Sequence, residues 1–150
     1  MSGTNFKSGQ KVRLHDEDNV PYSANNPVPV YVGESETGTE IHDYDEQVVV
    51  KDTSEDHDYT VTAGKTLFLN KVLFSASCRM FCELKVETGV GTDTFDIIAS
   101  GFIKAGGESD AIDFGNRPKR VAAGVKVRVS KYNEDNQDAS LYDTIVGLEL

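Results

Sequence analysis

The stretch Cys78-Arg79-Met80-Phe81-Cys82-Glu83-Leu84-Lys85-Val86-Glu87 decides the fold class, because apolar and polar side chains alternate along it. A period of two places alternate side chains on opposite faces of a β-strand. The face that begins with Cys78 is apolar, and the face that begins with Arg79 carries most of the charge. The stretch therefore predicts a strand with one buried face.

The same alternation recurs on both sides of this stretch. Val125, Val127 and Val129 alternate with polar residues, and a similar pattern runs from Tyr142 to Leu150. Glycine-rich or acidic turns separate the segments, and no segment of ten or more residues has a helical stripe. We expect eight antiparallel strands, forming a two-sheet jelly-roll sandwich. Their predicted ranges are 47–51, 58–62, 66–74, 78–87, 94–102, 110–114, 125–130 and 142–150.

The composition changes near residue 45. Residues 1–45 hold three of the four prolines and carry three basic and eight acidic side chains. Proline removes a backbone donor and favours extended conformations, and so few apolar groups cannot form a core alone. We expect an extended attachment arm over residues 1–45 and a jelly-roll domain over residues 46–150. The side chains expected to anchor the arm to a partner are Val12, Leu14, Pro27, Val28, Pro29, Val30, Tyr31 and Val32.

The net charge of -10 excludes several kinds of partner. Nucleic-acid binding depends on clustered Lys and Arg, so an acidic chain predicts no nucleic-acid partner. The same charge disfavours an anionic membrane surface. No apolar run is long enough to span a bilayer, and the N-terminus lacks the apolar stretch of a signal peptide. We therefore expect a protein that is made in the cytoplasm and does not enter a membrane.

The two cysteines do not predict a disulfide or a metal site. Cys78 and Cys82 lie four residues apart on one predicted strand, about 13 Å from each other, which is too far for a disulfide bond. His15, His42 and His57 show no paired ligand spacing that would complete a zinc site. We expect both cysteines to be reduced and buried.

The remaining motifs predict no catalytic site and no cofactor. Gly64-Lys65-Thr66 resembles the end of a phosphate-binding loop, but position 59 holds tyrosine in place of the required glycine. His57 could act as a base, yet no nucleophile accompanies it, so a metal-dependent hydrolase remains a minor alternative. Structural calcium could bind acidic loops, although no loop has the EF-hand spacing. These loops are residues 16–18, 55–58 and 133–138.

Three segments resemble parts of tailed-bacteriophage virion proteins. Residues 12–30 are similar to the leading arm of small head and tail proteins, and residues 59–77 to the first half of jelly-roll capsid-decoration and fibre modules. Residues 127–149 are similar to the closing strands of those modules. The resemblance implies a non-enzymatic decoration (cement) protein, a homotrimer on the virion surface whose partner is the major capsid protein.

The sequence also allows a second function and predicts how attachment and trimer contacts would be made. A glycan- or receptor-binding module of a head fibre or tail tip is the alternative function, because such modules are also β-sandwiches. Attachment through an acidic arm should weaken as salt rises, because salt screens exposed charges. The subunit contacts of a trimer are expected at strand residues opposite the core, namely Phe81, Ile98 and Ile145.

Overall fold

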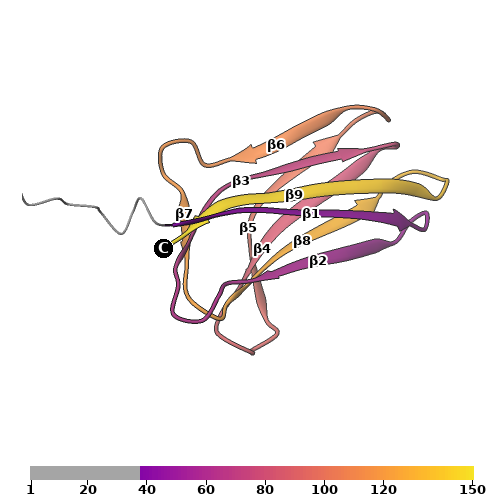
Figure 1. Cartoon of the computed structure of the whole chain (residues 1–150). Helices are drawn as coiled ribbons and strands as arrows, with labels where there is room; N and C mark the ends of the chain where they lie inside the picture. The colour runs from indigo at the N-terminus through magenta and orange to yellow at the C-terminus, as the bar shows by residue number, and fades with distance from the viewer. Residues whose placement is uncertain (1–37) are drawn as a thin grey trace, which may run out of the picture. The chain divides into compact units, whose positions relative to one another are not determined.

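The computed structural model describes residues 38–150, which form an all-β protein of two antiparallel sheets. One sheet has the order β1-β9-β3-β6, and the short strand β7 also pairs with β3. The other has the order β2-β8-β4-β5 (Figure 1). The strands are β1 Thr39–Val49, β2 Ser54–Thr60, β3 Leu67–Ala76, β4 Met80–Glu87, β5 Phe95–Ile103, β6 Ser109–Asp113, β7 Lys119–Val121, β8 Lys126–Asn133 and β9 Ala139–Glu149.

The nine strands include a counterpart of each of the eight predicted ones. The additional strand is β7, which has three residues and was too short for alternation to reveal. Within the described residues there is no helix that could span a membrane. The predicted sandwich is therefore confirmed at the level of two antiparallel sheets, with one strand more than expected.

The sandwich begins earlier than the composition predicts. Strand β1 starts at Thr39 and pairs with β9 along its whole length, so residues 39–45 belong to the sheet and not to the arm (Figure 1). The prediction over residues 47–51 found only the end of this strand, because the inward-facing side chains nearer its start include Asp43 and Asp45. Its outward-facing residues, such as Tyr44, are exposed.

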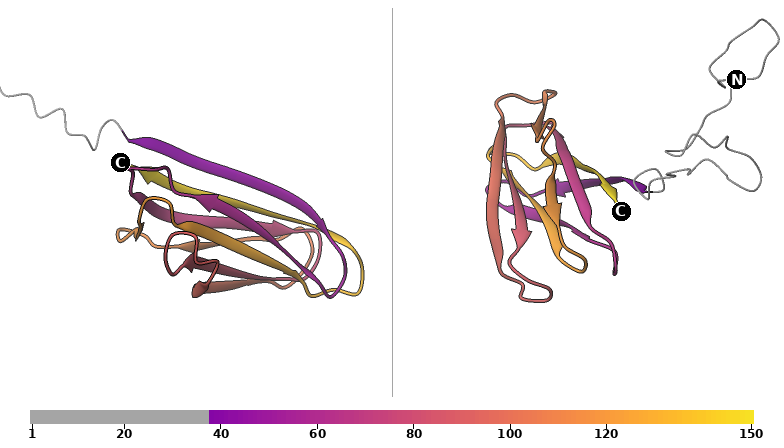
Figure 2. Two further views of the ribbon diagram at one scale, coloured as in Figure 1. Left: turned by 90° about the horizontal axis from the view of Figure 1, so that it is seen from below. Right: turned by 90° about the vertical axis from the view of Figure 1, so that its left-hand side faces the viewer.

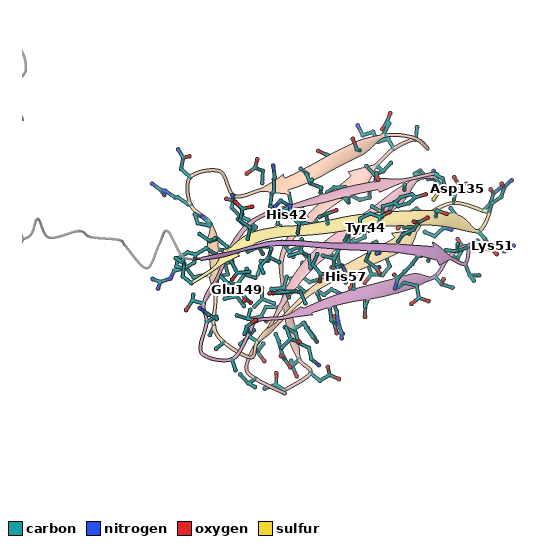
Figure 3. All side chains as sticks on the ribbon, in the orientation of Figure 1. His42, Tyr44, Lys51, His57, Asp135 and Glu149 are labelled. Carbon is teal, nitrogen blue, oxygen red and sulfur yellow. The ribbon has the colours of Figure 1, made fainter. Side chains whose placement is uncertain are left out.

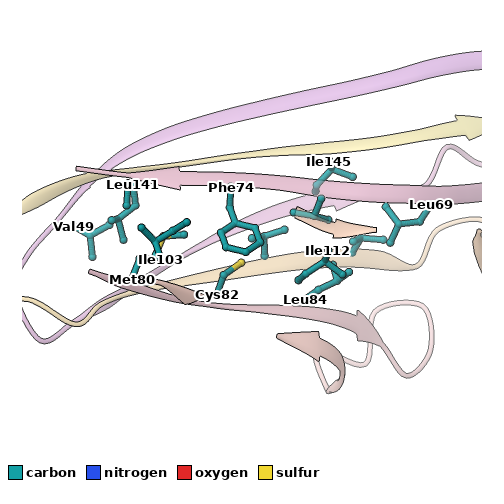
Figure 4. Packing of buried hydrophobic residues seen from close by; sticks show 14 of the residues in the cluster. Val49, Leu69, Phe74, Met80, Cys82, Leu84, Ile103, Ile112, Leu141 and Ile145 are labelled. Carbon is teal, nitrogen blue, oxygen red and sulfur yellow. The ribbon is translucent and has the colours of Figure 1, made fainter. Parts of the chain in front are cut away.

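The two sheets lie as two layers (Figure 2), and the hydrophobic core fills the space between them (Figure 4). The apolar face of the opening stretch is buried as predicted: Cys78, Met80, Cys82 and Leu84 are all less than 10% exposed. From the facing sheet, β3 and β9 contribute side chains such as Phe74. Complete burial of a large apolar side chain contributes about 1.5–3 kcal/mol, so this shared core holds the two sheets together.

Both cysteines are free and buried, as the sequence predicted. Burial raises the pKa of the Cys82 thiol to about 12, and the negative charge of Asp143 acts in the same direction. The thiolate is the reactive form of cysteine, so Cys82 behaves as an apolar core residue rather than as a nucleophile.

Candidate functional site: a buried ionic cluster between the sheets

Five charged side chains meet in the interior, where the edge of one sheet faces the edge of the other. Strands β1 and β9 supply three carboxylates, and β8 and β2 supply one lysine and one histidine. We call this set the ionic cluster. Its members are Asp43, Asp45, His57, Lys131 and Asp143. Charged residues are almost never fully buried unless they are paired, so each contact of the cluster needs an account.

Lys131 is the central cation of the cluster. Its side chain is 0% exposed, and Nζ lies 2.5 Å from Asp45 Oδ2 and 2.5 Å from Asp143 Oδ1. Asp143 is also 0% exposed, whereas Asp45 is 25% exposed. Because β8 and β9 belong to different sheets, the contact between Lys131 and Asp143 joins the two layers of the sandwich.

The pairing register explains why two carboxylates meet Lys131. Asp45 of β1 is the direct partner of Asp143 of β9, and both side chains point inward. Like charges directly opposite each other destabilise an antiparallel pair. The ammonium group of Lys131 removes this repulsion by lying between the two carboxylates.

His57 bridges the remaining carboxylates. His57 lies on β2 (Figure 3), its Nδ1 lies 2.7 Å from Asp143 Oδ2, and its Nε2 lies 3.0 Å from Asp43 Oδ2. A carboxylate only accepts hydrogen bonds, so both ring nitrogens must donate and the imidazole must be charged. Burial lowers the pKa of His57, but the hydrogen bond that His57 donates to Asp143 and the charges of the nearby aspartates outweigh it. The pKa is therefore raised above its ordinary value.

On the side that faces the core, the cluster is surrounded by apolar residues. Asp143 lies between Leu141 and Ile145 on the inner face of β9, and both neighbours are 0% exposed. Across the sheet Asp143 pairs with Phe74, and Lys131 pairs with Cys82 of β4. A surrounding of this kind has a low effective dielectric, in which charge–charge interactions are stronger than in water.

The cluster does not fit a resident calcium ion. One ligand atom each from Asp45, His57 and Asp143 would lie within 4.8 Å of one another, but the Lys131 ammonium occupies the space between the two aspartates. Calcium prefers six to eight oxygen ligands, and here the carboxylates already pair with two cationic side chains, Lys131 and His57. A lysine ammonium therefore does the work that a metal would otherwise do.

The acidic loops considered for calcium have other partners where the structure describes them. Asp58 makes a two-point contact with Arg128, at 2.7 and 2.8 Å. The carboxylate of Asp56 accepts from Ser130 at 2.6 Å. In the loop at 133–138, Asn133 donates to the carbonyls of Val49 and Gln137. Residues 16–18 lie outside the described residues.

A second buried carboxylate, outside the ionic cluster, lies at the C-terminal end of β2. Glu149 is 3% exposed, and its Oε1 accepts hydrogen bonds from Tyr59 Oη at 2.6 Å and from the Thr62 backbone amide at 2.9 Å. Burial raises the pKa of Glu149, but these hydrogen bonds lower it further than burial raises it. Glu149 therefore stays ionised and ties β9 to the end of β2.

The outer faces of the two sheets differ in character. On the β1-β9-β3-β6 sheet, a largely apolar groove crosses β3 and β9, with Glu40, His42 and Lys71 also in its lining; we call it the outer groove. On the other sheet, three aromatic side chains form a row across β8, β4 and β5, with ring centroids 5.5 and 4.8 Å apart; we call it the aromatic row. Residues that line the outer groove include Phe68, Leu73, Pro118, Val146 and Leu148, and the aromatic row is Tyr132, Phe81 and Phe102.

The structure describes only some of the residues that were expected to contact a partner. Val12, Leu14, Pro27, Val28, Pro29, Val30, Tyr31 and Val32 lie outside the described residues. Phe81 is on an outer face, within the aromatic row.

The other two expected interface residues belong to the interior. Ile98 lies where the β4–β5 pairing shifts register, and it packs against the core. The prediction that Ile145 contacts another subunit is wrong, because its side chain is 0% exposed and lies in the core. The alternation in β9 was assigned to the wrong faces: the inner face carries Asp143 and Glu149, which made it look like the solvent face.

Sequence reasoning identified His57 as a titratable group but did not find its partners. Lys131 follows the valines of β8 with the same spacing of two, and that spacing was the available signal for its inward direction. The cluster combines an amine-bearing side chain, carboxyl groups and a proton donor. No family model and no curated protein matches the chain, so this geometry has to be interpreted by itself.

Proposed function

We propose that this chain is a non-enzymatic structural protein of a phage virion, a jelly-roll module that decorates the capsid and binds the major capsid protein, as a homotrimer. The observation that carries the proposal is the outer groove, an apolar surface on a chain that is otherwise strongly acidic. Exposed apolar patches of this kind are typical of protein–protein contact sites.

The strand order supports the jelly-roll part of the proposal. Successive strands alternate between the two sheets from β1 to β4, and the orders β1-β9-β3-β6 and β2-β8-β4-β5 place the last long strand beside the first. Jelly rolls combine two Greek keys in two sheets in this way. The short strand β7 is an addition at the edge of this arrangement.

The outer groove has the chemistry that attachment requires. Leu73 is 40% exposed on β3, and Val146 and Leu148 of the neighbouring strand β9 share the lining of the groove with it. Removing such side chains from water against a partner favours association. Many copies on one shell would gain further affinity through multivalency, because neighbouring sites raise the effective concentration.

A binding experiment with Leu73→Asp tests this function. Purified protein is titrated onto heads that lack it, and occupancy is measured by sedimentation. We expect the apparent dissociation constant to rise at least about ten-fold, because an unpaired charge at an apolar contact costs more than about 1.4 kcal/mol. Ile97→Asp is the matched control, because Ile97 is 59% exposed on the other sheet. Unchanged binding by Leu73→Asp would contradict attachment through the outer groove.

The aromatic row favours the alternative function, a glycan- or receptor-binding module. Phe102 is 57% exposed beside Phe81, and aromatic faces are apolar surfaces on which the carbon faces of sugar rings can stack. Binding of the full chain to a glycan array, lost in Phe102→Ala and kept in Leu73→Asp, would establish this function. Silence across a broad array would exclude it and leave attachment to the capsid as the single proposal.

A further inference from the structure

The ionic cluster contains the reacting groups of an amide-forming reaction. An amine can join a carboxyl group when the nitrogen meets the carboxyl carbon, a base takes protons from the nitrogen, and an acid protonates the oxygen that leaves. Lys131 supplies the nitrogen, and its Nζ lies 2.5 Å from Asp143 Oδ1, which is bonded to the carboxyl carbon Cγ. This inference concerns the interior of the sandwich and does not depend on the proposed function.

The two oxygens of Asp143 have separate partners. Oδ1 accepts from Lys131, while Oδ2 accepts from His57 Nδ1 at 2.7 Å. A charged imidazole at this distance withdraws electron density from the carboxyl group and can protonate Oδ2. Asp43 holds the other ring nitrogen of His57 at 3.0 Å and fixes the orientation of the ring, so Asp43 is a positioning residue.

Asp45 is placed as the proton acceptor. Its Oδ2 lies 2.5 Å from Lys131 Nζ, within the reach that general-base catalysis requires. Asp45 is 25% exposed and Asp143 is 0% exposed, so the environment differs between the two carboxylates. Because only Asp45 of the two reaches the surface, it can pass an accepted proton on to solvent. The buried carboxylate is the better electrophile.

Burial favours the reaction thermodynamically. In water, the free ammonium and carboxylate ions are strongly solvated, which opposes amide formation. Inside the sandwich both ions have lost this solvation, and an amide replaces the buried charge pair by a neutral group. Fixing the two groups in contact also gives effective molarities of about 10⁵–10⁸ M for well-oriented reactions.

We propose that Lys131 and Asp143 form an intramolecular isopeptide bond that covalently joins strand β8 of one sheet to strand β9 of the other. Lys131 Nζ attacks Cγ of Asp143, a C–N bond forms, and the bond between Cγ and Oδ2 breaks. Of the three protons on the ammonium group, one remains on the amide nitrogen and two leave with Oδ2 as water. Asp45 and His57 relay these protons and return to their starting states, and nothing is oxidised or reduced.

Mass spectrometry of the full-length folded protein tests the bond. We expect an intact mass that is lower than the sequence mass by one water molecule. Trypsin does not cleave after an acylated lysine, and residues 132–150 contain no Lys or Arg. The digest should therefore yield one fragment of residues 129–150 that lacks one water. A full sequence mass in protein whose circular dichroism shows the folded sheets would overturn the proposal.

Variants assign the reacting groups. Lys131→Met removes the nucleophile and should restore the full mass, and its apolar side chain suits the buried site. Asp143→Asn retains a carboxyl-derived carbon and should lose ammonia in place of water. Asp45→Asn removes the proton acceptor and should leave the protein at full mass. Lys85→Met is the matched control, because Lys85 lies on the outer face of β4 beside Glu83 and should not affect the mass loss.

Two results would contradict this assignment even if water is lost. Retention of the mass loss in Lys131→Met would show that another residue pair reacts. A branched tryptic product that joins Lys131 to the peptide containing Asp45 would show that Asp45 is the electrophile and that Asp143 is not. Each of these outcomes is distinguishable from failure of head attachment, which is measured on a different surface.

Discussion

Individual residues in the interior of this protein balance the cost of burying charge by making several hydrogen bonds each. Lys131 contacts two carboxylates, and the His57 ring contacts a carboxylate through each nitrogen. Removing one partner from such a pair costs about 3–5 kcal/mol, because the other charge remains buried and unpaired. Each charged residue of the cluster therefore stabilises the fold only while its partners are present.

The hydrogen bond from Tyr59 to Glu149 gives a test at this scale. Tyr59→Phe removes the hydroxyl that donates to Glu149 at 2.6 Å and should lower the free energy of unfolding by about 1.5 kcal/mol, as expected for a bond to a charged group. Urea denaturation measures the change. Tyr44→Phe is the control, because the Tyr44 hydroxyl donates to exposed Glu46 at 3.3 Å. Equal effects of the two substitutions would contradict a special role for the buried bond.

Strand β9 is the element on which the sandwich depends most. It pairs with β1 on one side and with β3 on the other, and its inner face carries Asp143, Ile145 and Glu149. It therefore contributes to the ionic cluster, to the core and to the contact with Tyr59. The strand also adapts to an irregularity in β3, where the register shifts between Leu69 and Lys71.

Gly147 makes this adaptation possible. A Cβ at position 147 would lie 2.8 Å from the carbonyl oxygen of Phe68 and 2.8 Å from Leu67 Cδ1. Gly147→Ala should therefore force β3 and β9 apart and destabilise the protein by about 1–3 kcal/mol, as overpacking does. Thermal unfolding measures the loss. Gly89→Ala, in a turn where the nearest contact is the Thr92 side chain at 3.2 Å, is the control and should cost less.

At the scale of the whole molecule, the two kinds of interior have different roles. The apolar core between β3, β4 and β9 supplies the general driving force for folding, and the ionic cluster joins the edges that β1 and β2 would otherwise leave apart. An isopeptide bond would convert part of that junction into a covalent link between the sheets. Resistance to unfolding is the property that a protein on the outside of a virion would gain from it.

The full chain has a net charge of -10, and several of the acidic side chains of residues 38–150 lie on the edge strands β1 and β2. Acidic side chains line the outward face of the edge strand β1, including Glu40 and Glu46, and several more lie on β2. Charged edges discourage a strand from pairing with other chains, and net charge limits association through self-repulsion. The outer groove, next to β1, is largely apolar although Glu40 belongs to its lining, and it is therefore the natural place for a specific contact.

The sequence by itself determined that the protein is a sandwich of antiparallel strands, because alternation with a period of two reports which residues face a core. It also determined that Cys78 and Cys82 are buried thiols, since both fall on an apolar face. Where the inner face is charged, the same reasoning failed. Residues 39–45 of β1 were assigned to the arm because of the acidic composition of residues 1–45, and Ile145 was assigned to the surface because its inner-face neighbours are acidic.

Only the tertiary structure decided that these carboxylates point inward and meet cations. Asp43, Asp45 and His57 are separated in the sequence by more than 70 residues from Lys131 and Asp143, and only the pairing and packing of the strands brings them together. A charge can be buried when a partner from a distant strand removes the cost of desolvation, and pattern analysis of one strand cannot include that partner. The local period of the sequence sets the fold class, and long-range pairing of charges sets the site.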